Sequence, residues 1–477
     1  MRGLYQVVSF YIFTLLLSCT FFSKKERLPD QASNIKIDLS LKSRSFTDAP
    51  IGLSLNQLNE SAFPLTTLKA TLKNSGIKYL RFPEGESADN YLWSKPPYEK
   101  ANPRVANVDM WPGKDSTVTN ADGTFKYGLD FDAFMDIVQA TDAHANIVLC
   151  YPCGDKNKSL ELAKHWVKYA NITKKFGIIN WELGNESYLK NYNGESTPVE
   201  DYAHDLIEFS TELKKVDPKI RIGANGDKKV WWEKLLAYKD PKSGKTVAES
   251  IDFLVLHNYP MGGSLDIYSD YLKAENLTTS LSDLKKIINN YNSRLTIAVT
   301  ETNALSFKGQ DQNNLGTAIV VFDMIGQLIV ESKVEFAQMW TSHWVQNKKS
   351  NTLQSVLDSN NNLSPIGKAV EAWGAHLQDT VFKVSSDLNL TVYGSFSADK
   401  KELTLFLINK IPSIQNFSAT IDSDSKIYLK NDVKFFSGKN TDDSNPVWSI
   451  SKDIFINMNK IMIQLQPTSI TLISLKL

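Results

Sequence analysis

The sequence predicts an α/β fold, a (β/α)8 TIM barrel followed by a C-terminal β-sandwich domain. From residue 51 onward, short apolar runs bounded by polar turns alternate with helical stretches, as in the repeated βα units of a parallel sheet. After residue 376 helical periodicity is absent, and short alternating strands continue to the C-terminus. With 477 residues, the chain is long enough for one barrel and an accessory domain.

Eight strands are expected in the barrel, which we place at residues 51–376. They are 51–55, 77–82, 146–151, 178–184, 220–224, 253–257, 295–300 and 336–341. The expected helices are 65–74, 131–143, 159–173, 199–215, 230–238, 281–291, 314–332 and 365–376. The last of these begins with Ser364 as N-cap and Pro365 at the first helical position. In a TIM barrel the active site lies where the strands run into the following helices.

The sandwich is expected at residues 377–477, with strands at 388–393, 403–407, 417–421, 427–429, 461–465 and 470–475. Residues 35–50 begin with an alternating run, and we expect them to add a strand to this domain.

The N-terminus has the features of an export signal. An apolar run from residue 7 to 17 is too short to span a bilayer as a mature helix but suits a secretory signal. Residues 16–19, Leu-Leu-Ser-Cys, resemble a bacterial lipobox. The resemblance implies a signal peptide at 1–19, lipidation of Cys19, a tether at 20–34 and a cell-envelope lipoprotein. The alternative is an ordinary signal peptide that is cleaved nearby.

Charge and composition exclude several classes of partner. The formal net charge is zero, and we find no basic stripe, so neither nucleic acid nor an anionic membrane surface is expected to bind. No strand is followed by a glycine-rich phosphate turn, and no clustered His/Asp motif is present, so no cofactor or metal is expected. Aromatic residues make up 11% of the chain, which suits stacking on sugar rings as well as an aromatic core.

Two cysteines lie at the end of the third expected strand as Cys150-Tyr-Pro-Cys153. With no second Cys pair in the mature chain and no nearby His, zinc and redox chemistry are disfavoured. A tight disulfide and two unreactive thiols both remain open.

Two strands end in a glutamate. Residues 178–184 run into Asn185-Glu186, and residues 295–300 run into Glu301. Glycoside hydrolysis needs one acid that gives a proton to the leaving oxygen and a second that attacks or supports the oxocarbenium-like carbon. In one barrel, Glu186 and Glu301 would meet although they lie far apart in the sequence. The pair therefore indicates a carbohydrate substrate.

Side-chain alternation indicates how these acids point. Ile297, Val299 and Glu301 share one strand face, and branched residues fill barrel interiors, so we expect Glu301 at the top of the interior. Glu182 shares a face with Glu186 but lies deeper, where an ionised carboxylate is costly unless it is paired. We interpret Glu182 as structural.

Several segments match the motifs of one enzyme group. Residues 80–83 read Leu-Arg-Phe-Pro, 181–186 read Trp-Glu-Leu-Gly-Asn-Glu, 257–259 read His-Asn-Tyr and 467–472 read Pro-Thr-Ser-Ile-Thr-Leu. Residues 162–171, a helical segment, match as well. The chain resembles clan A glycoside hydrolases, which are retaining enzymes with the acid/base after strand four and the nucleophile after strand seven. The longest match is to the α-L-arabinofuranosidases of the family numbered fifty-one, and it extends in patches from residue 51 to the C-terminus.

The resemblance assigns a role to each matching residue. It implies that Glu186 is the general acid/base, that Glu301 is the nucleophile, and that Asn185 contacts the hydroxyl next to the reacting carbon. Arg81 and Tyr259 would hold the Glu301 carboxylate ionised, and Trp340 would form a sugar platform. His257 is expected either to contact substrate or to be a packed strand-end residue. An ionised Glu301 is expected to raise the pKa of Glu186 and keep it protonated.

Departures from the family leave its sugar open. Members of that family usually carry a Glu just after strand one and Gly-Gly after strand two, where this chain has Ser-Leu-Asn-Gln at 54–57 and Pro-Glu-Gly-Glu at 83–86. The 181–186 motif is also similar to that of the heparanase and β-glucuronidase family, and xylosidases share the barrel. Fold cannot choose among them. We expect an exported, retaining glycoside hydrolase; the alternative outside enzymes is a non-catalytic glycan-binding lipoprotein.

Overall fold

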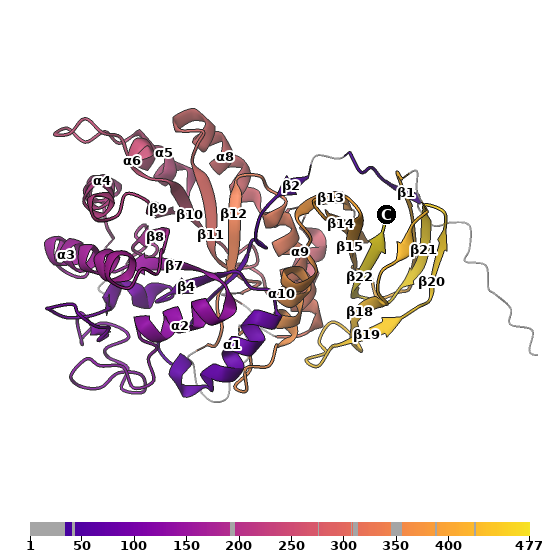
Figure 1. Ribbon diagram of the computed structural model, residues 1–477, viewed down its shortest axis with the longest axis horizontal. Coiled ribbons are helices and arrows are strands. Elements are labelled where there is room, and N and C mark those ends of the chain that lie inside the picture. Colours follow the sequence, from indigo (N-terminus) through magenta and orange to yellow (C-terminus); the bar gives the residue numbers. More distant parts are fainter. Residues whose placement is uncertain are drawn as a thin grey trace, which may run out of the picture.

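The computed structural model describes residues 34–40, 43–190, 196–274, 276–306, 308, 313–344, 355–386, 389–423 and 426–477 (Figure 1). Eight parallel strands close into a barrel, and a β-sandwich packs beside it. The predicted fold class is therefore confirmed. The predicted signal peptide, tether and lipidation site at Cys19 lie outside the described residues.

The barrel strands follow the chain order around the ring, and each pairs in parallel with its neighbours. They are β3 (Ile51–Ser54), β4 (Tyr79–Phe82), β7 (His144–Leu149), β8 (Asn180–Leu183), β9 (Arg221–Gly226), β10 (Phe253–Asn258), β11 (Thr296–Thr302) and β12 (Val334–Met339). Each lies at a predicted strand position, with bounds shifted by a few residues.

Helices cover the outside of the barrel (Figure 1). They are α1 (Leu65–Asn74), α2 (Phe131–Thr141), α3 (Lys156–Val167), α4 (Val199–Val216), α5 (Lys229–Ala237), α6 (Val247–Ser250), α7 (Ile267–Lys273), α8 (Thr279–Tyr291), α9 (Leu315–Ile329) and α10 (Pro365–His376). Side chains that accept hydrogen bonds from the first-turn amides fix several starts, as Asp155 does for α3 and Ser364 for α10. The short helices α6 and α7 were not predicted from the sequence.

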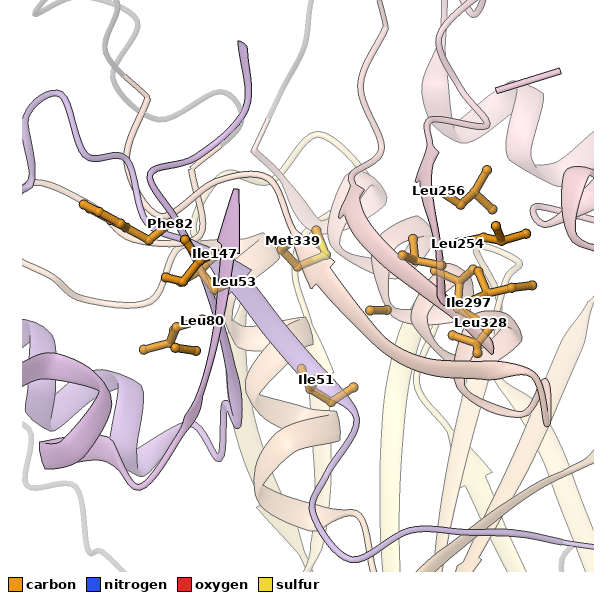
Figure 2. Close-up of a cluster of buried hydrophobic side chains, with 14 of the residues drawn as sticks. Ile51, Leu53, Leu80, Phe82, Ile147, Leu254, Leu256, Ile297, Leu328 and Met339 are labelled. Carbon is orange, nitrogen blue, oxygen red and sulfur yellow. The ribbon is translucent and has the colours of Figure 1, made fainter. Parts of the chain in front are cut away.

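The buried apolar layer lies between the strands and the helices. Figure 2 shows Leu80 and Ile297 of the strands and Leu328 of α9 as members of this cluster. The predicted strand parity is therefore wrong for β11, because Ile297 and Val299 face the helices. The lower barrel interior instead holds a separate cluster of Phe253, Val255, Ala298 and Phe336.

Two antiparallel sheets form the sandwich. One contains β19 (Val447–Ser451), β18 (Val433–Ser437), β22 (Ser469–Lys476), β15 (Glu402–Asn409), β14 (Leu390–Phe396), β13 (Thr380–Ser386) and β2 (Arg44–Ser45), with β17 (Tyr428–Leu429) beside β22. The other contains β16 (Gln415–Ile421), β21 (Lys460–Leu465), β20 (Ile454–Asn457) and β1 (Asn34–Ile37), which runs parallel to β16. A polar N-terminal segment thus contributes a strand to each sheet.

The barrel and the sandwich share a core through α9 and α10, which lie between them (Figure 1). The ring of Trp373 on α10 stacks on Phe406 of β15 at 4.3 Å. Tyr393 of β14 donates a hydrogen bond to the buried Asp323 of α9 at 2.5 Å. Within the described ranges, no helix is long and apolar enough to cross a bilayer.

Candidate active site

Arg81 lies at the end of β4 with its side chain fully buried. Its guanidinium donates to Glu182 at 2.9 Å, to Glu301 at 2.7 Å and to the Asn185 side-chain oxygen at 2.9 Å. Burial lowers the pKa of Arg81, but the two carboxylates more than compensate and raise it. Arg81 is therefore a permanent cation, and Glu182 has the structural role predicted for it, since it is paired and also accepts from Asn146.

A β-bulge turns Glu301 toward Arg81. Along the β10–β11 pair, Leu256 is opposite Val299 and the next residue, His257, is opposite Glu301, so Thr300 is the extra residue. The bulge reverses the alternation, which explains how Val299 and Glu301 face opposite sides of the barrel wall. Tyr259 donates to the second oxygen of Glu301 at 2.8 Å. The nucleophile candidate is therefore held at both oxygens.

Glu186 lies in the turn after β8 with a positive φ of 46°. Its Oε1 atom is 2.8 Å from Nδ1 of His257 and accepts from the Tyr188 hydroxyl at 3.1 Å. The turn is fixed from β9, because Asn225 accepts from the Ser187 amide at 2.9 Å and donates to the Leu183 carbonyl oxygen at 2.9 Å.

The two candidate catalytic carboxyls lie on either side of His257. One oxygen of Glu186, one oxygen of Glu301 and a ring nitrogen of His257 all lie within 4.8 Å of one another. The His257 Nδ1 atom is 3.5 Å from Glu301 and belongs to a side chain that is 3% exposed. The structure therefore brings these acids, separated by more than a hundred residues, to one point at the carboxyl ends of the strands.

The pKa of Glu186 differs from the sequence prediction. Burial raises it, but the hydrogen bond and charge of His257 and the hydrogen bond from Tyr188 outweigh burial, so the pKa lies below its ordinary value. The pKa of His257 is raised, because the charges of Glu301 and Glu186 outweigh the lowering effect of burial. The pKa of Glu186 in the free protein therefore shifts in the direction opposite to the expected one, because His257 and Tyr188 favour its ionised form.

Aromatic rings border the two acids. Trp340, which follows β12, meets Tyr259 edge-on at 6.5 Å and Trp344 at 4.3 Å. A Cβ atom on Gly85 would lie 2.7 Å from a Glu301 oxygen and 3.5 Å from the Trp340 ring nitrogen. Trp340 therefore lies beside the nucleophile candidate, where a sugar platform was predicted.

Three acidic or phenolic residues of the site were not assigned by the sequence. Tyr188 contacts Glu186, Asp89 accepts from the Asn185 amide at 2.9 Å, and Glu84 is 4% exposed. Burial and the charge of Glu301 raise the pKa of Glu84 well above its usual range, and burial does the same for Asp89. Glu84 follows the second strand directly, so its position was a usable signal. Nothing in the sequence pattern marks Tyr188.

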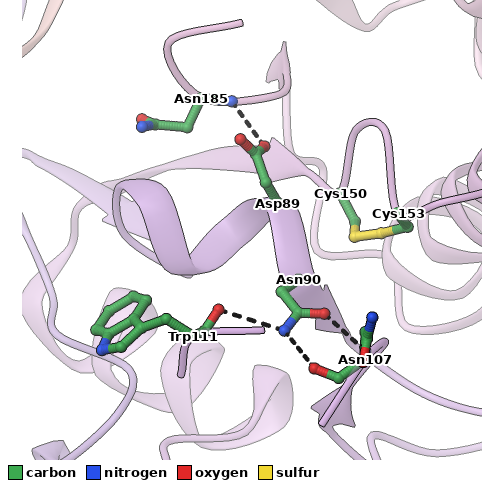
Figure 3. The surroundings of a disulfide bond; sticks show 7 residues. All are labelled: Asp89, Asn90, Asn107, Trp111, Cys150, Cys153 and Asn185. Carbon is green, nitrogen blue, oxygen red and sulfur yellow. Dashed lines mark hydrogen bonds between the residues drawn. A yellow bond between two sulfur atoms is a disulfide. The ribbon is translucent and has the colours of Figure 1, made fainter. Parts of the chain in front are cut away.

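A disulfide supports the turn that carries Glu186. Cys150 and Cys153 are bonded, which decides between the two alternatives (Figure 3). Between them, Tyr151 is buried and donates to Asp205 of α4 at 2.8 Å. A Cβ on Gly184 would lie 3.2 Å from the Tyr151 carbonyl oxygen, so this loop packs directly against the start of the turn. Figure 3 also shows the hydrogen bond that the Asp89 carboxylate accepts from the backbone amide of Asn185, the residue before Glu186.

Two groups of side chains in the described part of the chain have the spacing of metal ligands. One is Glu186, His257 and Glu301, and the other is His204, Asp205 and Glu208 on α4. Arg81 already neutralises the first group, and the Lys156 ammonium lies 2.9 Å from both carboxylates of the second. Both groups therefore already contain a cationic side chain.

The chain is similar in sequence to several curated proteins. Probable α-L-arabinofuranosidase C of Aspergillus fumigatus is 29% identical over 261 residues, which are 48% of each chain. α-L-Arabinofuranosidase C of Emericella nidulans is 26% identical over 311 residues, 58% of each chain. The chain resembles α-L-arabinofuranosidases. It spans about half the length of the curated relatives it matches, and no protein-family model matches it.

Solved structures show the same fold. The α-L-arabinofuranosidase of Thermotoga maritima superposes with a TM-score of 0.71 over 93% of this chain and 100% of its own, at 18% identity. A family 51 α-L-arabinofuranosidase of Bifidobacterium longum gives 0.72 over 94% and 100%, at 12% identity. A family 44 xyloglucanase of Paenibacillus polymyxa gives 0.66 over 93% and 99%, at 16% identity. The predicted resemblance to family 51 of the clan is confirmed.

Proposed function

We propose that the chain is an exported, retaining glycoside hydrolase that removes a neutral sugar from polysaccharide, most like an α-L-arabinofuranosidase. The observation that carries the proposal is the pairing of Glu186 and Glu301 across His257, with one oxygen of each within 4.8 Å. Retaining glycosidases hold their two carboxyl groups about 5–5.5 Å apart, and inverting enzymes leave about 6.5 Å or more for a water. The short separation supports retention.

In the first step Glu301 attacks the anomeric carbon. A bond forms between a Glu301 oxygen and that carbon, the glycosidic carbon–oxygen bond breaks, and the departing oxygen takes a proton from Glu186. The hydrogen bonds from Arg81 and Tyr259 hold the Glu301 carboxylate in place as an anion. The proton that the leaving group takes comes from the protonated form of Glu186.

In the second step a water hydrolyses the glycosyl–Glu301 ester. Glu186 accepts a proton from the water, the water oxygen bonds to the anomeric carbon, and Glu301 leaves as a carboxylate. The hydrogen bonds that lower the pKa of Glu186 favour the anion needed for this step.

The charges of the site favour a neutral sugar over a uronic acid. Arg81 and His257 both already face carboxylates. A uronate carboxylate would therefore find no unengaged cation among these residues and would be repelled by Glu301 and Glu186. This argues against the glucuronidase and heparanase alternative. The relatives named as α-L-arabinofuranosidases support arabinose as the neutral sugar.

Hydrolysis of a panel of nitrophenyl glycosides tests the proposal. We expect turnover of the α-L-arabinofuranoside and none of the β-D-glucuronide. Glu186→Ala should lower kcat by about 10²–10⁴-fold, and Glu301→Ala by about 10⁴-fold or more, with azide restoring turnover to the latter. Undiminished activity in either variant, or binding of arabinosides without turnover by the wild type, would refute it.

Export and lipidation form a separate part of the proposal. The lipobox-like residues 16–19 support cleavage before Cys19 and attachment of lipid to its thiol. The intact mass of the membrane-extracted protein checks this, because an unmodified Cys19 or cleavage elsewhere rules out the anchor and leaves the enzyme proposal untouched.

A further inference from the structure

Tyr188 is the second hydrogen-bond donor to the acid/base candidate. Its hydroxyl lies 3.1 Å from Oε1 of Glu186, the same atom that His257 approaches at 2.8 Å. The Glu186 side chain is 27% exposed, and none of the hydrogen bonds found in the described ranges reaches its other oxygen, Oε2. One oxygen is therefore held by two side chains of the protein, and the other has no hydrogen bond within the described ranges.

The Tyr188 ring is itself held in place. It meets the ring of Trp231 edge-on at 6.1 Å, and Trp231 donates to the Asn225 carbonyl oxygen at 3.0 Å. The Asn225 side chain accepts from the Ser187 amide, next to Glu186. Burial and the charge of Glu186 raise the pKa of Tyr188 well above its usual range, so the hydroxyl remains a donor at every working pH. Strand β9 thus fixes both the acid/base turn and the donor.

We propose that Tyr188 is a positioning residue for Glu186: with His257 it anchors Oε1, so that Oε2 is the oxygen that gives the proton to the leaving group and takes one from water. This rests on the proposed function. Tyr188 stabilises the ionised form of Glu186 more than the protonated form, and the ionised form is the one that the second step requires. Its effect is therefore largest on hydrolysis of the glycosyl–Glu301 ester.

Other charged or titratable groups lie near Glu186. They are Arg81 on β4, Asp89 after β4, His257 and Tyr259 on or after β10, and Glu301 on β11. In the glycosyl–enzyme, Glu301 is esterified and uncharged. The pH dependence of ester hydrolysis then reports the pKa of Glu186 while His257 is still protonated. Of the two groups in the pair, Glu186 releases its proton first.

The experiment measures kcat of Tyr188→Phe as a function of pH with a dinitrophenyl arabinoside. Its good leaving group departs without a proton from an acid, so hydrolysis of the glycosyl–Glu301 ester is rate-limiting. A burst of phenolate confirms that regime. Removing the donor raises the pKa of Glu186, so we expect the acidic limb of kcat to move upward by about one pH unit. At a pH below that limb, kcat should fall about tenfold relative to the wild type.

Tyr127→Phe, at a tyrosine that is 52% exposed, is the matched control and should leave the limb unmoved. Trp231→Phe keeps the Tyr188 hydroxyl but loosens its ring, and should move the limb in the same direction by less. It serves as the second test if Tyr188→Phe does not fold. A folded variant with lower kcat and an unmoved limb would overturn the inference. A wild type that hydrolyses no glycoside would instead overturn the proposed function.

Discussion

Glu84 lies in the stretch at residues 83–86, which corresponds to the usual Gly-Gly of the family that the chain resembles. Its backbone φ is +94°, in a region that costs a residue with a Cβ about 1–3 kcal/mol, and its Oε1 atom is buried with no hydrogen-bond partner. The other contact of the carboxyl is the Thr341 hydroxyl, which itself donates to the Ser54 carbonyl oxygen at 2.9 Å. A hydroxyl has one proton to donate, so Glu84 fits this arrangement as the donor, that is, as an uncharged acid.

We expect Glu84→Gln to stabilise the protein increasingly as the pH rises. Below the unfolded-state pKa the carboxyl is protonated in both states. Above it, the unfolded chain releases the proton while the folded chain keeps it, so wild-type stability falls by up to about 1.4 kcal/mol per pH unit. Gln has no such dependence.

Urea unfolding of both proteins between about pH 5 and pH 7 measures the difference in the free energy of unfolding. The exposed Glu99 provides the control Glu99→Gln, for which no trend is expected. A constant or shrinking difference for Glu84→Gln would show that Glu84 is ionised in the folded protein.

Arg81→Gln should both destabilise and inactivate the protein. It leaves Glu182 and Glu301, at 0% and 7% side-chain exposure, without their cation, and breaking a buried ion pair costs about 3–5 kcal/mol. The denaturant midpoint and kcat should fall together. Arg294→Gln, at an exposed residue, should change neither, and an Arg81 variant as stable as this control would contradict the ion-pair account.

At the scale of elements, the turns after the strands place the chemistry. The bulge at Thr300 points Glu301 inward, the left-handed turn after β8 presents Glu186, and Gly85 in the turn after β4 leaves room for the Glu301 carboxylate. Each depends on one or two backbone angles that hydrophobic periodicity does not record. This is why the strand positions could be predicted, whereas the direction of Ile297 and Val299 relative to Glu301 could not.

Gly85→Ala should displace the nucleophile candidate Glu301, because the new Cβ would lie 2.7 Å from one of its oxygens. A shift of about 1 Å costs about 10²-fold in rate, so we expect kcat to fall at least that far with little loss of stability. Gly263→Ala is the matched control, since no heavy atom lies within 4 Å of its Cβ. Equal kcat values for the two variants would argue against close packing at Gly85.

The sequence also predicted most helices, since α1 and α10 begin and end where periodicity and caps placed them. It missed β18, β19, β20 and β13 of the sandwich. Strand β19 alternates poorly and is half exposed at a sheet edge, so burial does not impose a pattern on it. The low pKa of Glu186 could not be predicted either, because it depends on Tyr188 and His257 meeting at one oxygen.

At the scale of the whole molecule, we expect the barrel and the sandwich to unfold as one unit, because they share a buried core. Asp323 of α9 is 1% exposed and accepts from Tyr271 at 2.8 Å and from Tyr393 of the sandwich at 2.5 Å. Lys410 lies 3.8 Å from the same carboxylate. A buried charge is thus satisfied by groups from both domains.

Tyr393→Phe should lower the free energy of unfolding by about 1–3 kcal/mol, because it removes a donor from that buried carboxylate. The loss should appear in a single cooperative transition that tryptophan fluorescence and circular dichroism report together. Tyr428→Phe, at a sandwich residue that is 56% exposed, should change nothing. Two separate transitions would contradict a shared core.

The configuration of the first sugar released tests the central claim most directly. Proton NMR during hydrolysis of nitrophenyl α-L-arabinofuranoside distinguishes the anomers before they interconvert. Two carboxyls with oxygens within 4.8 Å, one attacking and one exchanging protons, should release the α-anomer first. Initial release of the β-anomer would mean that water attacks directly, and would contradict Glu301 as the nucleophile.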